Sequence, residues 1–448
     1  MKKFDLKAAA EAVGGRIMGE NVLVSGVFTD TRKPVPGGLF LALAGERFDG
    51  HAFVPSLEEG DTAAVLIGRE LETVLPAVIV KDTGRALCDL AAWHRARFDI
   101  PVIALTGSVG KTTTKEMIAV VLSRRGKTLK TEGNLNNNIG MPLTLLRLDD
   151  DDTAAVIEMG MNHAGELSLL TSVCRPTAAL ITNVGVNHIE NLGSRENILK
   201  AKLEILEGLE KGSLVFLNAD NDLLAPLDLP DFEVVRYGLE ADAPITAREI
   251  ETAADGTDFT LCVYGETARV RLNSPGVHNV CNALAAAAVG YHHGVPVSQI
   301  ADALAEYAPT GRRQRTVKYG DVTLIDDCYN ASPTSTKASL EVLAGSPGRR
   351  IAILGDMLEL GSFAEDMHKD VGAYCKGRAD LLFAYGRLSR YTAQLAGAAG
   401  VPSRSFTDAA ELSREVKKIL AGGDTVLVKG SRGMKMEQII AGIFENRE

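Results

Sequence analysis

The segment PVIALTGSVGKTTT, residues 101–114, joins a run of apolar residues to a glycine-rich loop, which is followed by a lysine and three threonines. The apolar run predicts a buried strand. Beyond the loop, apolar residues recur at helical spacing at Met117, Ile118, Val121 and Leu122, which predicts a helix. A tight loop between a strand and a helix N-terminus is typical of a phosphate-binding site, because the first amides of a helix lack internal partners and attract anions.

The chemistry of this loop favours a nucleotide over a plain glycine turn. The two glycines permit a tight turn, Lys111 can reach the terminal phosphates, and the Thr112 hydroxyl can bind Mg²⁺. The spacing G-x-x-G-K-T differs from the usual nucleotide loop, which would need a glycine at Leu105. We expect the nucleotide contacts to be Gly107, Ser108, Val109, Gly110, Lys111, Thr112 and Thr113.

The composition of the chain is that of a globular protein with several domains. Its 448 residues suffice for two to four domains, and 46% are apolar and 24% charged. A net charge of −10 argues against broad binding to nucleic acid or anionic lipid. The six cysteines form no C-x-x-C pair, which argues against a zinc or redox motif. Without a membrane-length apolar run, and with Asp5 and Glu11 interrupting any leader-like start, we expect a cytoplasmic protein.

Apolar runs alternate with helical stretches along most of the chain, which predicts α/β domains with helix-covered sheets. Residues 1–83 are expected to form a small α/β domain. Residues 84–311 contain the phosphate loop and predict a central domain with a parallel sheet. Residues 312–448 predict a doubly wound, Rossmann-like domain. Ligands of such sheets bind beyond the carboxyl ends of the strands, so the residues after each strand are the functional candidates.

Two such residues are candidates to hold Mg²⁺ beside the phosphates. Glu158 ends the run AAVIEMG, and His188 follows AALITNVG, so both are expected near Thr112 at one sheet edge. Taken singly, each is more often an ordinary polar residue. Histidine is also a less usual Mg²⁺ ligand than carboxylate, so His188 can instead act through a water.

Two groups of asparagines each allow two interpretations. Asn279 and Asn282 lie on one side of a predicted helix, where they either cap it or meet the edge of a base. In GNLNNNIGMP, residues 133–142, turn chemistry explains the asparagines, but amides also suit a sugar or peptide ligand. This second group comprises Asn134, Asn136, Asn137 and Asn138.

Two groups of basic residues also allow more than one interpretation. Lys200 and Lys202 lie in a predicted helix, and composition alone favours a solvated basic face for them. The segment PTGRRQR, residues 309–315, falls at the boundary between the second and third predicted domains. A guanidinium there can close onto a γ-phosphate or belong to a solvated linker. The arginines concerned are Arg312, Arg313 and Arg315.

Seven segments, in order, resemble motifs of the Mur ligase family, the ATP-dependent amide-forming enzymes of peptidoglycan precursor synthesis. They are TGSVGKTTTKE, GNLNNNIGMP, EMGMNHAGEL, NHIENLGSRENILKAKLEI, GVHNVCNALAA, DDCYNASPTS and VLVKGSRGMKME. The likeness covers almost the whole chain. The N-terminal FTDTRKPVPGGLFLALAGERFDGHAFV is similar to the family's uridine-nucleotide domain, which folylpolyglutamate synthetases do not share.

This resemblance implies roles that spacing alone leaves open. Lys202 matches a lysine that Mur ligases carbamylate with CO₂, and the implied catalytic residues are Lys111, Lys202 and His188. The implied metal site comprises Thr112, Glu158, His188 and Lys202. Beyond the loop, the implied ATP contacts are Asn279, Asn282, Arg312 and Asp327. The implied UDP-substrate contacts are Asp30, Thr31, Arg32, Asn136, Asn137 and Asn138, and the implied acceptor contacts are Tyr329, Asn330, Ser332, Lys429, Ser431 and Arg432.

The resemblance also implies an activity. It is an ATP- and Mg²⁺-dependent ligation of D-alanyl-D-alanine to UDP-N-acetylmuramoyl-tripeptide through an acyl phosphate, carried out by a cytoplasmic monomer. The acidic-Asn-Pro-Arg signature of tripeptide-forming members is absent, which favours this acceptor. Many relatives read YNANPDS where this chain reads YNASPTS, which leaves the acceptor contacts at Ser332 and Thr334 open. The alternatives are a Mur-type ligase with another acceptor and a nucleotide-dependent regulatory protein that does not ligate.

Overall fold

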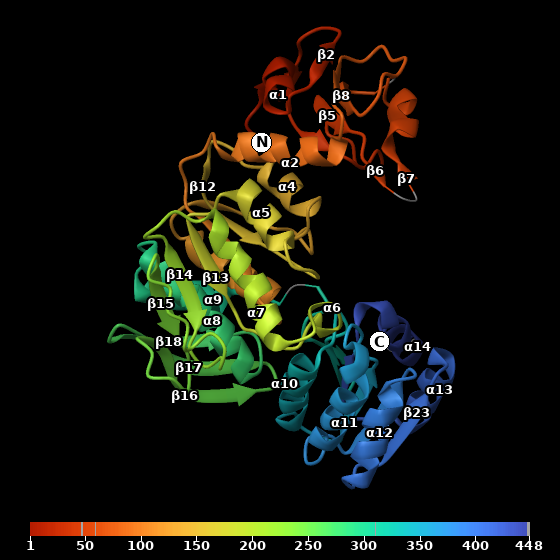
Figure 1. The fold of residues 1–448 in the computed structure, drawn as a ribbon. Helices are drawn as coiled ribbons and strands as arrows, with labels where there is room; N and C mark the ends of the chain where they lie inside the picture. The colour runs from red at the N-terminus through yellow and green to blue at the C-terminus, as the bar shows by residue number, and fades with distance from the viewer. Residues whose placement is uncertain (46–47, 59, 310, 446–448) are drawn as a thin grey trace.

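The computed structural model describes residues 1–45, 48–58, 60–309 and 311–445. It has three lobes, each built on its own sheet, with the central lobe in contact with the other two (Figure 1). This confirms the predicted α/β fold class. Thr310 in the predicted boundary segment and the last three residues of the predicted third domain lie outside the described residues.

The N-terminal lobe, red in Figure 1, has a five-stranded sheet in the order β2-β9-β8-β5-β4. All neighbours are parallel except β2 and β9. The strands are β2 (Arg16–Met18), β4 (Val27–Phe28), β5 (Gly38–Leu41), β8 (Thr62–Ile67) and β9 (Ala77–Ile79). Strand pairs β1 (Phe4–Asp5) with β3 (Leu23–Val24) and β6 (Ala44–Gly45) with β7 (Phe48–Asp49), helix α1 (Leu6–Ala12) and 3₁₀ helix η1 (Gly50–Leu57) complete the lobe.

The central lobe has a nine-stranded sheet in the order β11-β12-β10-β13-β14-β15-β16-β17-β18. From β11 to β16 the strands are parallel, as predicted, but β16, β17 and β18 pair antiparallel. The predicted parallel sheet is therefore extended by an antiparallel edge that the sequence analysis did not predict. The reason is that short turns join these three strands, and a tight turn can connect only antiparallel neighbours. The strands are β10 (Val102–Thr106), β11 (Lys127–Lys130), β12 (Asp152–Glu158), β13 (Ala178–Ile181), β14 (Leu214–Asn218), β15 (Glu233–Tyr237), β16 (Ile245–Ala253), β17 (Gly256–Val263) and β18 (Glu266–Leu272).

Helices cover both faces of this sheet. On one face, the alanine-rich stretch 283–288 of α8 is fully buried, and its small side chains allow α8 to pack closely against α3. On the other, α2 packs against α4 and α5 and also contacts α1 of the N-terminal lobe. The helices are α2 (Thr83–Arg95), α3 (Lys111–Leu122), α4 (Gly140–Leu145), α5 (Glu166–Cys174), α6 (Ile189–Leu192), α7 (Arg195–Leu203), η2 (Glu204–Gly208), α8 (Val277–His292) and α9 (Val297–Glu306).

The C-terminal lobe, blue in Figure 1, has a six-stranded sheet in the order β19-β20-β24-β21-β22-β23, parallel except for β19 at the edge. Side chains of β21 alternate between two apolar clusters, with Ile351 and Ile353 in one and Ala352 and Leu354 in the other. The sheet is thus buried on both faces, as a doubly wound sheet requires.

The strands of this lobe are β19 (Arg315–Tyr319), β20 (Val322–Asp326), β21 (Arg350–Gly355), β22 (Leu381–Tyr385), β23 (Ser403–Phe406) and β24 (Thr425–Lys429). Its helices are α10 (Pro333–Ala344), η3 (Gly361–Phe363), α11 (Ala364–Tyr374), α12 (Ser389–Ala398), α13 (Ala409–Ile419), η4 (Arg432–Met434) and α14 (Glu437–Phe444). None of the helices in the described ranges is both long and apolar enough to cross a bilayer.

Candidate active site

A cavity of about 840 Å³ lies where the central and C-terminal lobes meet. It is lined by the phosphate loop, by residues that follow β12, β13 and β14, by the start of α8, and by residues that follow β20 and end β24. Both sheets therefore present their carboxyl edges to one space, where ligands of such sheets bind. The volume lies within the range of small-molecule and cofactor sites.

The phosphate loop joins β10 to α3 in a conformation that requires glycine. Gly107 and Gly110 have φ angles of +154° and +83°, and a Cβ at Gly110 would lie 2.6 Å from Asn282 Oδ1. Lys111, the first residue of α3, folds back so that Nζ donates a hydrogen bond to the Gly107 carbonyl at 2.8 Å. Burial lowers the pKa of Lys111, an effect that nearby Glu158 opposes. A cation thus lies over a loop that can accept an anion.

Asn183, which the sequence analysis missed, holds the middle of this loop. Its Oδ1 accepts hydrogen bonds from the amides of Ser108 and Val109 at 3.1 and 2.9 Å. These two residues line the cavity, but their amides are already engaged by the protein. The amides of the first turn of α3 have no helical acceptors, so they are the ones available to phosphate. The signal for Asn183 was its place directly after a strand, as for Glu158 and His188.

Thr112 and Glu158 meet as the sequence predicted. Thr112 Oγ1 donates to Glu158 Oε2 at 2.9 Å, and Asn136 Nδ2 donates to Glu158 Oε1 at 2.8 Å. Only 1% of Glu158 is exposed. Adjacent ligands of an octahedral Mg²⁺, bound at about 2.1 Å, are themselves about 3 Å apart, so this oxygen pair fits two neighbouring positions.

The protein does not provide a complete metal cage. Within the described ranges, no cluster of three or more histidine, cysteine, aspartate or glutamate residues could hold a metal ion. Mg²⁺ commonly binds one or two carboxylates together with substrate phosphates and waters. The Thr112–Glu158 pair therefore fits Mg²⁺ that arrives with a nucleotide.

His188 lies in the same cavity but contacts the other lobe. It has a left-handed φ of +63° and precedes α6. Its Nδ1 is 2.7 Å from Glu359 Oε2 of the C-terminal lobe, without the alignment of a hydrogen bond. Glu359 was not predicted. Its position in the sequence, after β21, was the available signal.

Lys202 is buried, whereas Lys200 on the same helix is exposed. The interpretation of both as a solvated basic face is wrong for Lys202, of which only 2% is exposed. Burial, and secondarily the positive charge of Lys111, lower its pKa well below the usual value. Lys202 lies four residues after Ile198 and three before Ile205, both buried, so the apolar periodicity of the helix was the missed signal.

Asn279 and Asn282 both line the cavity, and the capping interpretation is wrong. The N-cap of α8 is Gly276, and no side chain caps it. Asn282 Oδ1 accepts a hydrogen bond from Thr114 Oγ1 at 3.1 Å, while Asn279 Nδ2 donates to Gln314 Oε1 at 2.8 Å. Asn282 thus connects α8 to the helix of the phosphate loop.

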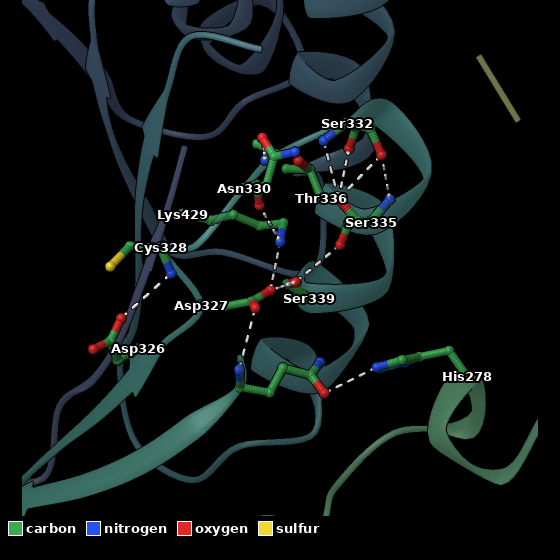
Figure 2. Close-up of polar contacts among 12 residues, drawn as sticks. His278, Asp326, Asp327, Cys328, Asn330, Ser332, Ser335, Thr336, Ser339 and Lys429 are labelled. Carbon is green, nitrogen blue, oxygen red and sulfur yellow. Dashed lines mark hydrogen bonds and ion pairs between the residues drawn. The ribbon is translucent and has the colours of Figure 1, made fainter. Parts of the chain in front are cut away.

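A chain of polar contacts connects α8 to the C-terminal lobe (Figure 2). His278 Nε2 lies 2.9 Å from Gln314 Oε1, and the backbone amide of Gln314 donates to Asp327 Oδ1 at 3.1 Å. Asp327 Oδ2 in turn accepts from Ser339 Oγ at 2.6 Å and Lys429 Nζ at 2.5 Å. Gln314, at φ +50°, was not predicted and joins the two lobes.

Comparison with known proteins identifies the family. The model described as "Mur ligase middle domain" matches residues 105–290, and "Mur ligase, glutamate ligase domain" matches residues 311–432. The UDP-N-acetylmuramoyl-tripeptide–D-alanyl-D-alanine ligase of Escherichia coli is 40% identical over 453 aligned positions, covering 100% of this chain and 99% of that protein. The chain belongs to the Mur ligase family. The resemblance inferred from the sequence motifs is confirmed.

Further Mur ligases are similar over their full length. The ligase of the same name from Bacillus subtilis is 38% identical, covering 100% of this chain and 99% of that protein. A crystal structure of MurF from Acinetobacter baumannii superposes with a TM-score of 0.92 at 31% identity, with both chains fully covered. The three-lobed architecture is therefore that of these Mur ligases.

Of the boundary arginines of this Mur ligase, Arg313 rather than Arg312 lines the cavity. Arg312 Nη1 is paired with Asp326 Oδ2 at 3.0 Å, whereas the Arg313 guanidinium lies 4.0 Å from the ring centroid of Tyr329. Arg312, which was predicted to contact phosphate, is thus engaged by Asp326 and does not line the cavity that contains the phosphate loop. The two arginines lie in a bent segment before β19, and the sequence analysis did not resolve their different surroundings.

The predicted acceptor residues fall into two groups. Tyr329, Asn330, Ser332 and Lys429 line the main cavity, while Ser431 and Arg432 line an adjoining recess of about 100 Å³. Ser332 is the N-cap of α10, where it accepts from the Ser335 amide at 3.4 Å. Serine and asparagine are comparable N-caps, so a change from Asn to Ser at this position of the motif preserves the start of the helix. Thr334 lines the main cavity.

The predicted UDP-substrate residues are divided between this cavity and the N-terminal lobe. Asp30 and Arg32 form a two-point ion pair on the N-terminal lobe, which holds the pKa of Asp30 at about 2, and Thr31 lies between them. Of the asparagine loop, Asn134, Asn136 and Asn137 line the main cavity, while Asn138 does not.

Turn chemistry accounts for one residue of the asparagine loop, and a contact within the protein engages another. Asn137 Oδ1 accepts from the amides of Ile139 and Gly140 at 3.2 and 2.9 Å, as turn chemistry predicts. Asn136 instead serves the cavity, because its amide donates to Glu158. The Asn138 carbonyl is 3.8 Å from Cys88 Sγ.

Proposed function

We propose that this chain is an ATP-dependent ligase, a cytoplasmic monomer that joins D-alanyl-D-alanine to UDP-N-acetylmuramoyl-tripeptide and releases ADP and phosphate. The observation that carries the proposal is the meeting, in one cavity, of a glycine-rich phosphate loop with the carboxyl edge of a second sheet. Relatives that bear the name of this activity are similar over their full length.

Each lobe is assigned one substrate. Residues 1–83 would bind the UDP end of the donor, with contacts from Asp30, Thr31 and Arg32. Residues 84–311 would bind ATP, with the adenine near Asn279 and Asn282 at the start of α8. Residues 312–448 would bind the dipeptide near Tyr329 and Lys429. This assignment places the reacting groups in the cavity between the second and third lobes.

The first step activates a carboxylate, because a carboxylate is inert toward amines at neutral pH. The donor carboxylate oxygen attacks the γ-phosphorus of ATP, the bond to the β–γ bridging oxygen breaks, and ADP leaves. Lys111 and the first amides of α3 stabilise the charge on the transferred group. Thr112 and Glu158 would hold Mg²⁺, which supplies further charge neutralisation when bound.

The second step consumes the acyl phosphate. The neutral amine of D-alanyl-D-alanine attacks the carbonyl carbon, and the tetrahedral species collapses to the amide, inorganic phosphate and a proton. The cavity walls from both lobes serve to exclude water and orient the amine. Lys429, fixed by Asp327 and the Asn330 carbonyl, contributes a positive charge on the acceptor side.

Lys202 is assigned as a carbamylated residue. Burial lowers the pKa of its amine well below the usual value, which favours the neutral form that reacts with CO₂. Addition of CO₂ to the neutral amine, with loss of one proton, would form a carbamate anion near Lys111. Such a group would support the metal site.

Phosphate release from ATP in the presence of UDP-N-acetylmuramoyl-tripeptide tests the proposal. D-Alanyl-D-alanine should stimulate release strongly, whereas single amino acids should not. Stimulation by a different amine alone would indicate a Mur-type ligase with another acceptor. ATP binding without release stimulated by any acceptor would instead indicate a regulatory protein.

A further inference from the structure

His188 and Glu359 form a contact between lobes from two strained positions. Both residues have φ +63°, a left-handed conformation that non-glycine residues rarely adopt. Nδ1 of His188 lies 2.7 Å from Oε2 of Glu359. Strain of this kind persists where the surrounding structure enforces it, and it gathers at functional sites.

The segment that carries Glu359 is held firmly by its own lobe. The Leu358 amide donates to Ser431 Oγ at 2.9 Å, and the Met357 amide donates to His368 Nε2 at 3.0 Å. On the opposite side, the Glu190 amide of α6 approaches the Glu359 carbonyl at 3.4 Å. The Glu359 carboxylate is thus presented to the central lobe from a rigid support.

We propose that Glu359 is a positioning residue that orients His188 toward the nucleotide phosphates and their metal ion only while the two lobes are in contact. The inference rests on the proposed function. A histidine at a metal site commonly has one ring nitrogen fixed by a carboxylate while the other faces the metal or its water. Here Nδ1 is next to the carboxylate, His188 lines the cavity, and the carboxylate comes from the acceptor lobe.

The side chains have room to align. The His188 side chain is 19% exposed and that of Glu359 is 56% exposed, so a small rotation completes the hydrogen bond that their present geometry lacks. Contact between the lobes would then complete the metal site. Phosphoryl transfer would therefore take place only when the acceptor lobe has arrived.

Mn²⁺ binding to the full-length protein in the presence of ADP tests this proposal without requiring turnover. Mn²⁺ shares the oxygen-rich octahedral preference of Mg²⁺ and is measured by electron paramagnetic resonance. Glu359→Gln should weaken Mn²⁺ binding by about 10- to 100-fold, the range for loss of a carboxylate behind a metal-site histidine. Glu359→Gly, which also relieves the left-handed strain, should weaken it equally.

Two controls separate positioning from a structural effect. Glu365→Gln removes an exposed carboxylate of the same lobe, paired with Lys369, and should leave Mn²⁺ affinity unchanged. In a His188→Gln background, adding Glu359→Gln should cause no further loss, because Glu359 acts through His188.

Unchanged Mn²⁺ affinity in both Glu359 variants would overturn the inference, as would a full additional loss in the double variant or equal loss in the Glu365 control. Acceptor-stimulated phosphate release by the unsubstituted protein reports separately on the proposed function. If the unsubstituted protein shows no acceptor-stimulated release but the Glu359 variants still bind Mn²⁺ more weakly, the ligase assignment is rejected and the role of Glu359 is retained.

Discussion

Lys202 shows how one buried side chain changes the chemistry available to the site. An amine without a compensating carboxylate is costly to keep charged in the interior, and burial accordingly lowers its pKa. We predict that Lys202→Ala lowers turnover by about 10- to 100-fold, the range seen when a metal-site support is lost. Turnover should partly recover with added small carboxylates.

The carbamate itself can be observed in the active protein. Carbon-13 NMR after equilibration with labelled CO₂ should show a carbamate signal that is absent in Lys202→Arg. An unmodified Lys202 amine in the active, metal-bound protein would contradict this prediction.

Substitution of Lys111 should have a different effect, because Lys111 stabilises the charge on the transferred phosphoryl group. Lys111→Ala should lower phosphoryl transfer by about 100- to 1,000-fold, the range for removal of a single electrostatic stabiliser of a transition state. Calorimetric binding of the UDP-linked donor should be nearly unchanged, since its predicted contacts with Asp30, Thr31 and Arg32 lie on another lobe. Normal turnover in this variant would refute the assignment.

At the scale of elements, the local features were predictable and the contacts between distant segments were not. The strand, loop and helix around the phosphate loop follow from adjacent residues, and β10 and α3 appear where the sequence placed them. Asn183 reaches this loop only because β10 pairs with β13. The β17–β18 turn gave only a partial signal, because its two positive φ angles suit Gly265 but are unusual for Tyr264.

The geometry of the phosphate loop predicts the effect of a Cβ at Gly110. Gly110→Ala meets both a left-handed φ and the Asn282 side chain, so it should raise the KM for ATP and destabilise the protein by more than the roughly 1–2 kcal/mol of conformational strain. Gly212→Ala is the matched control, because its φ is +82° but a Cβ there has open space. Equal thermal shifts and equal KM values for the two variants would contradict this account of the loop.

A buried histidine in helix α2, between the N-terminal and central sheets, should make the stability of the protein depend on pH. His94 is buried in it, with Nε2 3.0 Å from the Leu148 carbonyl, and burial lowers its pKa to about 4. The unfolded chain takes up this proton near pH 6.5, before the folded state does, so stability should fall as the pH falls from 6.5 toward 4.

From His94 alone, the loss between pH 7 and pH 5 should be about 2 kcal/mol. His94→Gln, which retains a donor for the carbonyl, should remove this part of the pH dependence in urea unfolding. The same slope in both proteins would show that other groups dominate.

At the scale of the whole molecule, three lobes and an α/β fold could be predicted from alternating strands and helices, but not the surface along which lobes meet. The contacts of Gln314 with His278 and of Glu359 with His188 cross that surface and join residues far apart in the sequence. Arg312 and Arg313 are adjacent in sequence but contact different residues of the C-terminal lobe, Asp326 and Tyr329 respectively. Their environments differ only once the C-terminal lobe is in place.

The central claim is that the two lobes enclose a donor carboxylate that takes the γ-phosphoryl group of ATP. Donor labelled with oxygen-18 in its terminal carboxylate tests it most directly. With ATP and D-alanyl-D-alanine, each phosphate released should carry one labelled oxygen, because that oxygen passes through the acyl phosphate. Amide formation with unlabelled phosphate would contradict the mechanism.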